Sequence, residues 1–204
     1  MKLYVFIGCM FLLCGCEKYL DVKPDKSLVV PTTLADLKAL LNNSDQMNSA
    51  YAVIQESATD NAYLESTRWQ NLTNLTAKNC YIWDSNLFND GELNEWSYAY
   101  VRVNYCNLVL TKLEESKDVS PDGSLIKGEA LFFRAASFYQ LLELFAHPYN
   151  KNTADRDLGI PLRLTSDINE KSSRASLQAC YDRIIDDLKE TLNLLPLTPA
   201  HKSK

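Results

Sequence analysis

An aromatic-rich stretch of the chain, from 51 to 88, offers the clearest candidate for binding chemistry. Its rings are Tyr51, Tyr63, Trp69, Tyr81, Trp83 and Phe88, and its polar residues include Arg68, Asn71, Asn79 and Asn86. A sugar presents apolar C–H faces that pack on flat rings, and its hydroxyls bond to amides and to the guanidinium group. The candidate ligand-binding residues are therefore Arg68, Trp69, Tyr81, Trp83 and Asn86. The alternative is that most of these rings anchor loops to a helical core.

Charged residues elsewhere do not form a catalytic pattern. Glu129 and Arg134 fall on an apolar helix, where a buried charge needs a partner, so we expect them to pair with neighbouring elements. Asp186 and Asp187 point about 100° apart on a helix, with Arg183 one turn before Asp187, and we expect both carboxylates to be solvated. The two histidines have no serine or cysteine nucleophile beside them. We predict that the protein is not an enzyme.

Metal, nucleotide and nucleic-acid binding are also not expected. Cys80, Cys106 and Cys180 show no CxxC spacing, and Cys106 and Cys180 fall on apolar helix faces, where a free thiol acts as a small hydrophobe. The glycines form no phosphate-binding loop. The net charge is −5 and no run of basic residues occurs, which argues against a polyanionic partner. We predict no metal, no cofactor and no nucleic acid.

The hydrophobic pattern predicts helices separated by long loops. The first runs from a cap at Thr33 to about residue 41, and three longer ones cover about 93–115, 124–146 and 176–195. Pro121–Ser124 is interpreted as a turn, 44–90 as mostly loop with one short helix, and Gly159–Leu162 as one extended piece. The predicted inner faces of the last two helices are Leu125, Gly128, Phe132, Ala135, Ala136, Tyr139 and Leu142, then Leu177, Cys180, Tyr181, Ile184, Leu188, Leu192 and Leu195.

No segment alternates as a strand, so the fold class is all-α. The second and third helices are offset by roughly 31 residues, close to the tetratricopeptide period of about 34. This spacing favours tetratricopeptide-like helical hairpins with long loops, although a plain helical hairpin gives it too.

The N-terminus has the pattern of an exported lipoprotein. An 11-residue apolar run, Leu3–Leu13, follows Lys2 and is too short to span a membrane core. The four residues that end at Cys16 (Leu, Cys, Gly, Cys) resemble the bacterial lipobox. We predict a signal peptide over 1–15, acylation (palmitate) at Cys16 and a lipidated tether over 16–31. The alternative is an ordinary secretory signal, with Cys16 a plain thiol.

Several ordered motifs together resemble the SusD/RagB family of outer-membrane nutrient-binding lipoproteins. They are Cys16–Val22, the helical set Trp96, Tyr100, Asn104 and Asn107, then Gly128–Ala135, Gly159–Leu162, the set Ser173, Arg174 and Ser176, and the set Tyr181, Ile184, Asp187 and Leu188. The family's members are longer, so the resemblance implies that 32–204 is an incomplete N-terminal helical domain.

The resemblance also implies a function. The family binds oligosaccharide nutrients without catalysis at the cell surface, and delivers them to a TonB-dependent transporter barrel in the outer membrane. Two alternatives are also compatible with the sequence. One is a tetratricopeptide-type scaffold that binds a protein partner, and the other is a surface glycoside hydrolase with paired carboxylates.

Overall fold

The computed structural model describes residues 31–48, 53–61, 63–88 and 94–198. The chain divides by its contacts into two units, Met1–Pro31 and Thr32–Lys204, and the fold below is that of the second. The predicted signal peptide, the acylated Cys16 and the tether up to residue 30 lie outside the described residues. Within the described ranges, no helix combines the length and the apolar character needed to cross a membrane.

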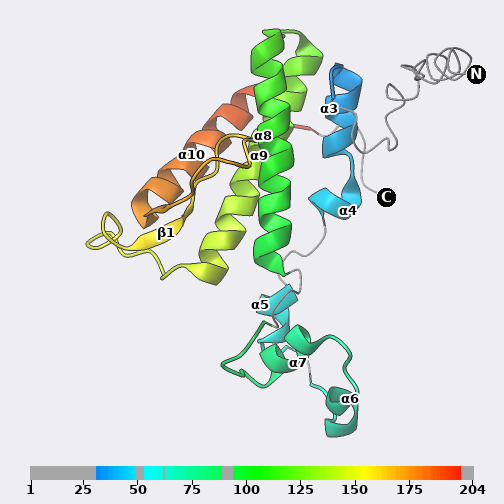
Figure 1. The fold of residues 1–204 in the computed structure, drawn as a ribbon, viewed down its shortest axis with the longest axis vertical. Coiled ribbons are helices and arrows are strands. Elements are labelled where there is room, and N and C mark those ends of the chain that lie inside the picture. The colour runs from blue at the N-terminus through cyan, green and yellow to red at the C-terminus, as the bar shows by residue number, and fades with distance from the viewer. Residues whose placement is uncertain (1–30, 49–52, 62, 89–93, 199–204) are drawn as a thin grey trace, which may run out of the picture. The chain divides into compact units, whose positions relative to one another are not determined.

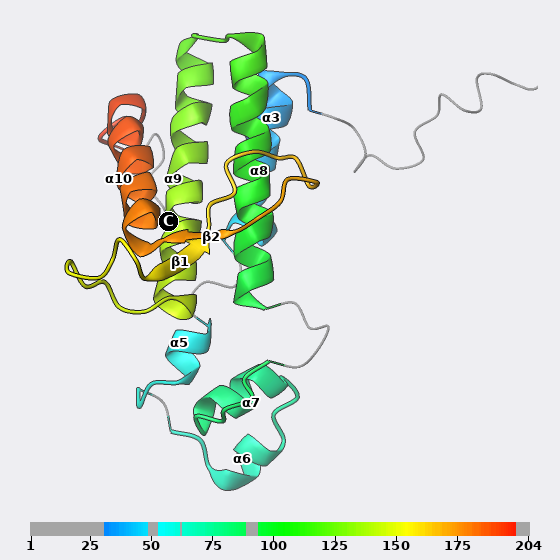
Figure 2. The ribbon, with the colours of Figure 1, turned by 60° about the vertical axis from the view of Figure 1, so that its left-hand side comes forward.

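Three long helices form the centre of the fold. They are α8 (Glu95–Ser116), α9 (Pro121–Phe145) and α10 (Leu177–Leu194), and α9 packs against both of the others (Figures 1 and 2). The core between them contains Ala99, Val103, Ala135, Phe138, Leu141, Leu142, Ile160, Leu177, Cys180 and Ile184. The prediction of a helical-hairpin fold is therefore confirmed.

A fourth helix, α3 (Leu34–Leu41), packs on the other side of α8 and α9. Leu37 and Leu41 are buried there in a second apolar cluster with residues of α8 and α9. The predicted cap is present: the Asp36 N–H donates to the Thr33 hydroxyl at 3.2 Å, and the Thr33 N–H donates to the Asp36 carboxylate at 3.0 Å. This reciprocal pair satisfies two N–H groups that a helix start leaves unpaired.

The segment predicted to be mostly loop is more helical than expected. It contains four short helices, α4 (Ser44–Met47), α5 (Val53–Ser57), α6 (Ser66–Gln70) and α7 (Leu75–Tyr81). The side chains of Asn43 and Asn74 accept from backbone N–H groups and begin α4 and α7. Helices of four to seven residues are too short to show a helical hydrophobic period, which is why the pattern missed them.

The turn predicted at Pro121–Ser124 is wrong. These residues form the first turn of α9, with Pro121 in its first position and Ser120 as the cap. The Ser120 hydroxyl accepts from the Gly123 N–H at 3.0 Å. Proline suits this position because the N–H it lacks would have no partner inside the helix.

The predicted inner faces of α9 and α10 are wrong in part. Phe132 and Tyr139 of α9 are 46% and 49% exposed, while Leu131 and Phe138 are buried. On α10, Leu188 and Leu192 are exposed, and the polar Asp187 and Thr191 are buried instead. The prediction assumed that each helix buries one apolar stripe. This assumption fails on α9 because the helix packs against α8, α10 and α3, so most of its circumference is covered.

A small antiparallel hairpin joins α9 to α10. Its strands are β1 (Leu158–Pro161) and β2 (Arg174–Ser176), with Leu158 opposite Ser176 and Pro161 opposite Arg174. The extended piece predicted around Gly159 forms most of β1, whereas β2 was not predicted. Ser176 ends β2 and also caps α10, accepting from the Ala179 N–H at 3.2 Å, as the sequence predicted for the cap.

Candidate functional site

Two of the most exposed aromatic rings of the 51–88 stretch, Tyr63 and Trp83, lie at one pocket. Tyr63, Tyr81 and Trp83 line it together with Ala58, Thr59 and Asp60, and its volume is about 750 Å³. The Tyr63 side chain is 84% exposed and the Trp83 side chain 79%. Large rings are usually covered, so two neighbouring rings this exposed mark a surface that can bind a partner.

The end of α7 positions two of these rings. Tyr81 is the last residue of α7, and its hydroxyl accepts from the Leu64 N–H at 2.9 Å and donates to the Leu64 carbonyl at 3.4 Å. These bonds hold the segment that carries Tyr63 beside the end of α7. Cys80 is buried beside the same turn, and its carbonyl accepts a hydrogen bond from the Trp83 N–H at 3.1 Å.

Trp83 itself has an unusual backbone. Its φ is 56°, in the left-handed region that non-glycine residues rarely adopt. Such a conformation costs about 1–3 kcal/mol and is concentrated at functional sites. Two hydrogen bonds hold the residues that follow: the Asp84 N–H donates to the Asn79 carbonyl at 2.9 Å, and the Asn79 amide donates to the Asn86 carbonyl at 2.8 Å. These bonds therefore fix the backbone of the turn that carries the Trp83 ring.

The structure brings together two of the five predicted ligand-binding residues. Tyr81 and Trp83 line the pocket, whereas Arg68, Trp69 and Asn86 are not among its lining residues. Tyr63 lines the pocket but was not in the predicted set. Its ring lies outside any helix in a polar surrounding, which was the available sequence signal.

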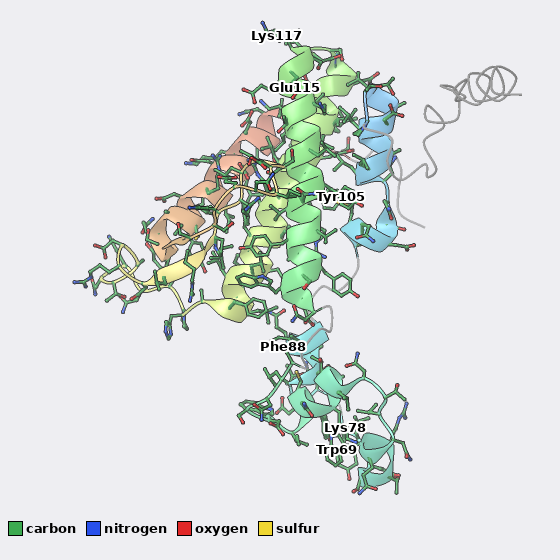
Figure 3. All side chains as sticks on the ribbon, in the orientation of Figure 1. Trp69, Lys78, Phe88, Tyr105, Glu115 and Lys117 are labelled. Carbon is green, nitrogen blue, oxygen red and sulfur yellow. The ribbon has the colours of Figure 1, made fainter. Side chains whose placement is uncertain are left out.

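Trp69 joins α6 to α7 (Figure 3). Its indole N–H donates to the Lys78 carbonyl at 3.0 Å, and the Lys78 ammonium lies 5.0 Å from the ring centroid. The polar atom of Trp69 is thus engaged, and a cation–π contact covers part of its ring. Arg68 is exposed on α6, and Asn86 is exposed in the loop after α7, with its N–H donating to the Asp84 carboxylate at 2.8 Å.

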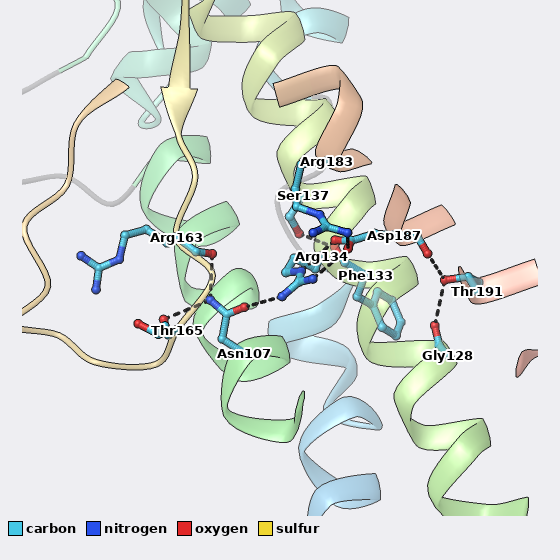
Figure 4. Close-up of polar contacts among 10 residues, drawn as sticks. All are labelled: Asn107, Gly128, Phe133, Arg134, Ser137, Arg163, Thr165, Arg183, Asp187 and Thr191. Carbon is cyan, nitrogen blue, oxygen red and sulfur yellow. Dashed lines mark hydrogen bonds and ion pairs between the residues drawn. The ribbon is translucent and has the colours of Figure 1, made fainter. Parts of the chain in front are cut away.

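The charged residues of the long helices form a buried network (Figure 4). Arg134 donates from Nε and Nη2 to the two carboxylate oxygens of Asp187, each at 2.8 Å, and from Nη1 to Asn107 at 3.0 Å. Arg183 adds an ion pair with Asp187 at 2.8 Å. The expectation that Asp187 is solvated is wrong, because Arg134 on the neighbouring helix compensates its charge.

The other predicted charge pairing is also present. Glu129 of α9 accepts from the Lys38 ammonium of α3 at 2.5 and 2.6 Å. The prediction that Glu129 and Arg134 pair with neighbouring elements is thus confirmed, and both tie the helices together.

The three described cysteines are free and buried. Burial raises the pKa of the Cys106 thiol to about 12, and it also raises the pKa of Cys180 and of Cys80. A thiol needs its thiolate form to react, so these groups act as small apolar side chains. Across the part of the chain that the structure describes, no cluster of three or more His, Cys, Asp or Glu residues could hold a metal ion.

The comparisons with known proteins agree with the fold. A SusD-like family model, described as starch-binding and associating with the outer membrane, matches residues 18–204, and the chain belongs to this family. No curated protein sequence matches the chain.

Solved structures of the SusD superfamily share the fold. One from Bacteroides thetaiotaomicron is 24% identical with a TM-score of 0.60, covering 80% of this chain and 38% of its own. One from Bacteroides vulgatus is 22% identical with a TM-score of 0.65, covering 82% and 39%. A SusD-like carbohydrate binding protein from Bacteroides vulgatus is 19% identical with a TM-score of 0.58, covering 85% and 38%. The present chain thus spans about two fifths of the length of these relatives.

Proposed function

We propose that this protein binds an oligosaccharide without cleaving it, at the pocket formed by Tyr63, Tyr81 and Trp83. The observation that carries the proposal is the pair of largely exposed rings, Tyr63 and Trp83, at a pocket of about 750 Å³. Membership of a family described as starch-binding supports the same ligand class.

The chemistry of the pocket suits a neutral sugar. Aromatic faces pack on the apolar C–H surface of a sugar ring, and this contact needs no metal or cofactor. The Asp60 carboxylate lines the pocket and has no hydrogen-bond partner among the described residues, so it is available to accept from sugar hydroxyls. Arg68, Trp69 and Asn86 remain predicted contacts for a longer oligosaccharide that extends beyond the pocket.

The proposal includes a cellular setting. The lipobox-like pattern at Cys16 supports acylation there, and the family description supports association with the outer membrane. A surface-anchored binding protein would then deliver its oligosaccharide to a TonB-dependent transporter barrel.

Titration calorimetry against a panel of oligosaccharides tests the binding site. Trp83→Ala should weaken binding by about 1–3 kcal/mol, the range for removing a large apolar contact. Leu192→Ala is the matched control, because Leu192 is 73% exposed on α10 and does not line the pocket. Trp69→Ala should weaken binding less than Trp83→Ala, because Lys78 covers part of that ring. Circular dichroism of each variant establishes that the fold is kept.

The opposite results would overturn the proposal in distinct ways. If Trp83→Ala binds like the unaltered chain, the pocket is not the sugar site. If chromatography shows that the sugars are cleaved, the protein is a glycoside hydrolase instead.

Mass spectrometry of the mature N-terminus tests the anchor. The expected species begins at an acylated Cys16, and Cys16→Ala should release the protein from the membrane fraction. A mature form that begins at another residue and carries no lipid would contradict the anchor and leave the sugar site untouched.

A further inference from the structure

A second pocket lies between α8 and the loop that joins β1 to β2. Its volume is about 380 Å³, within the usual range for small-ligand sites. Trp96, Tyr100 and Asn104 line it from α8, and Arg163, Ile168 and Ser172 line it from the loop. None of these residues lines the Trp83 pocket.

The loop side of this pocket is fixed in place by hydrogen bonds. The Asn107 amide of α8 donates to the carbonyls of Arg163 and Thr165 at 2.9 and 3.1 Å (Figure 4). The Arg163 guanidinium donates across the loop to the Glu170 carbonyl at 2.6 Å and to the Ser172 hydroxyl at 2.7 Å. A site whose walls are already ordered loses little conformational entropy when a ligand binds.

The α8 side supplies an aromatic wall. The rings of Trp96 and Tyr100 lie 4.9 Å apart, centroid to centroid, and the Tyr100 hydroxyl donates to the Pro161 carbonyl at 2.8 Å. Ile168 of the loop is 82% exposed, although it is a large aliphatic residue in a braced loop. The pocket therefore offers rings from α8 and an aliphatic side chain from the loop to an apolar surface.

Two polar groups of the pocket are left without partners. Among the described residues, neither the Trp96 indole N–H nor the Asn104 amide has a hydrogen-bond partner. The charge of Arg163, by contrast, is already engaged by the loop oxygens. Free neutral donors and acceptors beside apolar walls match a ligand that is uncharged, bears hydroxyls and has an apolar face.

We infer that this pocket is a second carbohydrate site, which takes a single neutral sugar ring independently of the Trp83 pocket. The inference rests on the proposed function for the ligand class, but not on the Trp83 pocket itself. A protein with two separate sugar sites would hold a branched or long glycan at two points, and its affinity for such a glycan would exceed that of either site.

The three tryptophans of the chain allow both sites to be observed at once. Each indole N–H gives one cross-peak in a ¹H–¹⁵N spectrum, assigned with Trp69→Phe, Trp83→Phe and Trp96→Phe. The full chain is titrated with maltotriose, cellotriose and mannotriose. The expected result is that at least one of these sugars shifts the Trp96 signal in a saturable way, and that this titration persists in Trp83→Ala.

Two surface variants test which side chains are responsible. Asn104→Ala should raise the apparent Kd from the Trp96 signal by about three- to tenfold, the effect of losing one hydrogen bond, and leave the Trp83 titration unchanged. Ile168→Ala should act in the same direction through lost apolar contact. Leu192→Ala is the matched control, because Leu192 is 73% exposed on α10 and lines neither pocket.

The outcomes separate this inference from the proposed function. If the Trp83 signal titrates and the Trp96 signal does not, the second site does not exist and the proposed function stands. If the Trp96 titration disappears in Trp83→Ala, the two signals report one site and the inference is wrong. If only the Trp96 signal titrates, the second site is supported and the Trp83 site is not. If neither signal titrates with any of the sugars, both are wrong.

Discussion

Arg134 of α9 and Asp187 of α10 form a two-point ion pair in the interior of the fold. Both bonds measure 2.8 Å, and the two side chains are 8% and 0% exposed. Asn107 of α8 accepts from the same guanidinium and donates its amide to the loop that borders the second pocket. One arginine thus links the three long helices and, through Asn107, the wall of a candidate binding site.

Asp187→Asn should therefore be strongly destabilising. The change leaves Arg134 buried without a full counter-charge, and breaking one partner of a buried pair costs about 3–5 kcal/mol. Chemical denaturation gives the free energy of unfolding. The control is Glu190→Gln, which breaks the half-exposed Lys127–Glu190 pair and should cost less than about 1 kcal/mol. Equal losses in the two variants would mean that the buried ion pair stabilises the fold no more than the half-exposed one.

The sequence could predict the charges of this network but not its geometry. Arg134 was expected to pair because it lies in an apolar helix, and Arg183 was recognised one turn before Asp187. Which face of α10 turns inward depends on where α9 lies, and that is information about tertiary packing. The same limit applies to the proposed sugar site. The aromatic content of 51–88 indicates Tyr81 and Trp83, whereas the two hydrogen bonds between the Tyr81 hydroxyl and the Leu64 backbone, which hold Tyr63 near them, cannot be read from the sequence.

Gly159 of β1 allows the hairpin to approach α10 closely. A methyl group at this position would lie 2.5 Å from the Cys180 sulfur and 3.2 Å from the Leu177 Cα. Gly159→Ala should lower the free energy of unfolding by about 1–3 kcal/mol, the usual cost of overpacking. Gly123→Ala is the comparison, because its new methyl group would meet the Asp118 carboxylate, which accepts two hydrogen bonds from Ser120. Any loss of stability there should not depend on the residue at position 180.

A double-mutant cycle identifies the cause of the Gly159 effect. Cys180→Ala removes the sulfur, so the double variant should be less destabilised than the sum of the two single variants. Simple additivity would show that the sulfur is not the obstacle, and that the strain arises from the backbone at Leu177.

Asp36 should make the stability of α3 depend on pH. Hydrogen bonds from the Thr33 side chain and backbone lower the pKa of Asp36 below its usual value of 3.8. The folded protein thus binds the proton less tightly than the unfolded chain, and the cap contributes fully above pH 3.8. Its contribution is lost as the pH falls below that value towards the folded pKa.

The difference in stability between the unaltered chain and Asp36→Ala measures this effect. It should be constant near neutral pH and shrink below pH 3.8. In a Thr33→Val background the pH dependence should be weaker, since the largest cause of the shift has been removed. A difference that grows on acidification would reverse the sign and contradict the assignment.

The sequence predicts those elements that have strong local signals. It does not predict those whose conformation depends on tertiary packing. The Thr33 and Ser176 caps and the three long helices follow from nearest-neighbour chemistry and a long apolar period. The short strand β2 could not be predicted, because three residues carry no pattern and its pairing with β1 depends on where α9 and α10 hold the two segments.

The orientation of α9 supplies the last prediction, on Phe138 and Phe132. Phe138 is fully buried in the main core, whereas Phe132 is 46% exposed on the outer side of the helix. Phe138→Ala should cost about 3–5 kcal/mol through lost burial and the cavity left behind. Phe132→Ala should cost less than about half of that, because a half-exposed ring gives up less apolar surface and leaves no closed cavity. Urea denaturation of both variants at several protein concentrations measures the two losses. A Phe132→Ala loss that matches the Phe138→Ala loss at high protein concentration and shrinks on dilution would show that Phe132 is covered by another copy of the chain. Equal losses at every concentration would show that the assignment of the α9 faces is wrong.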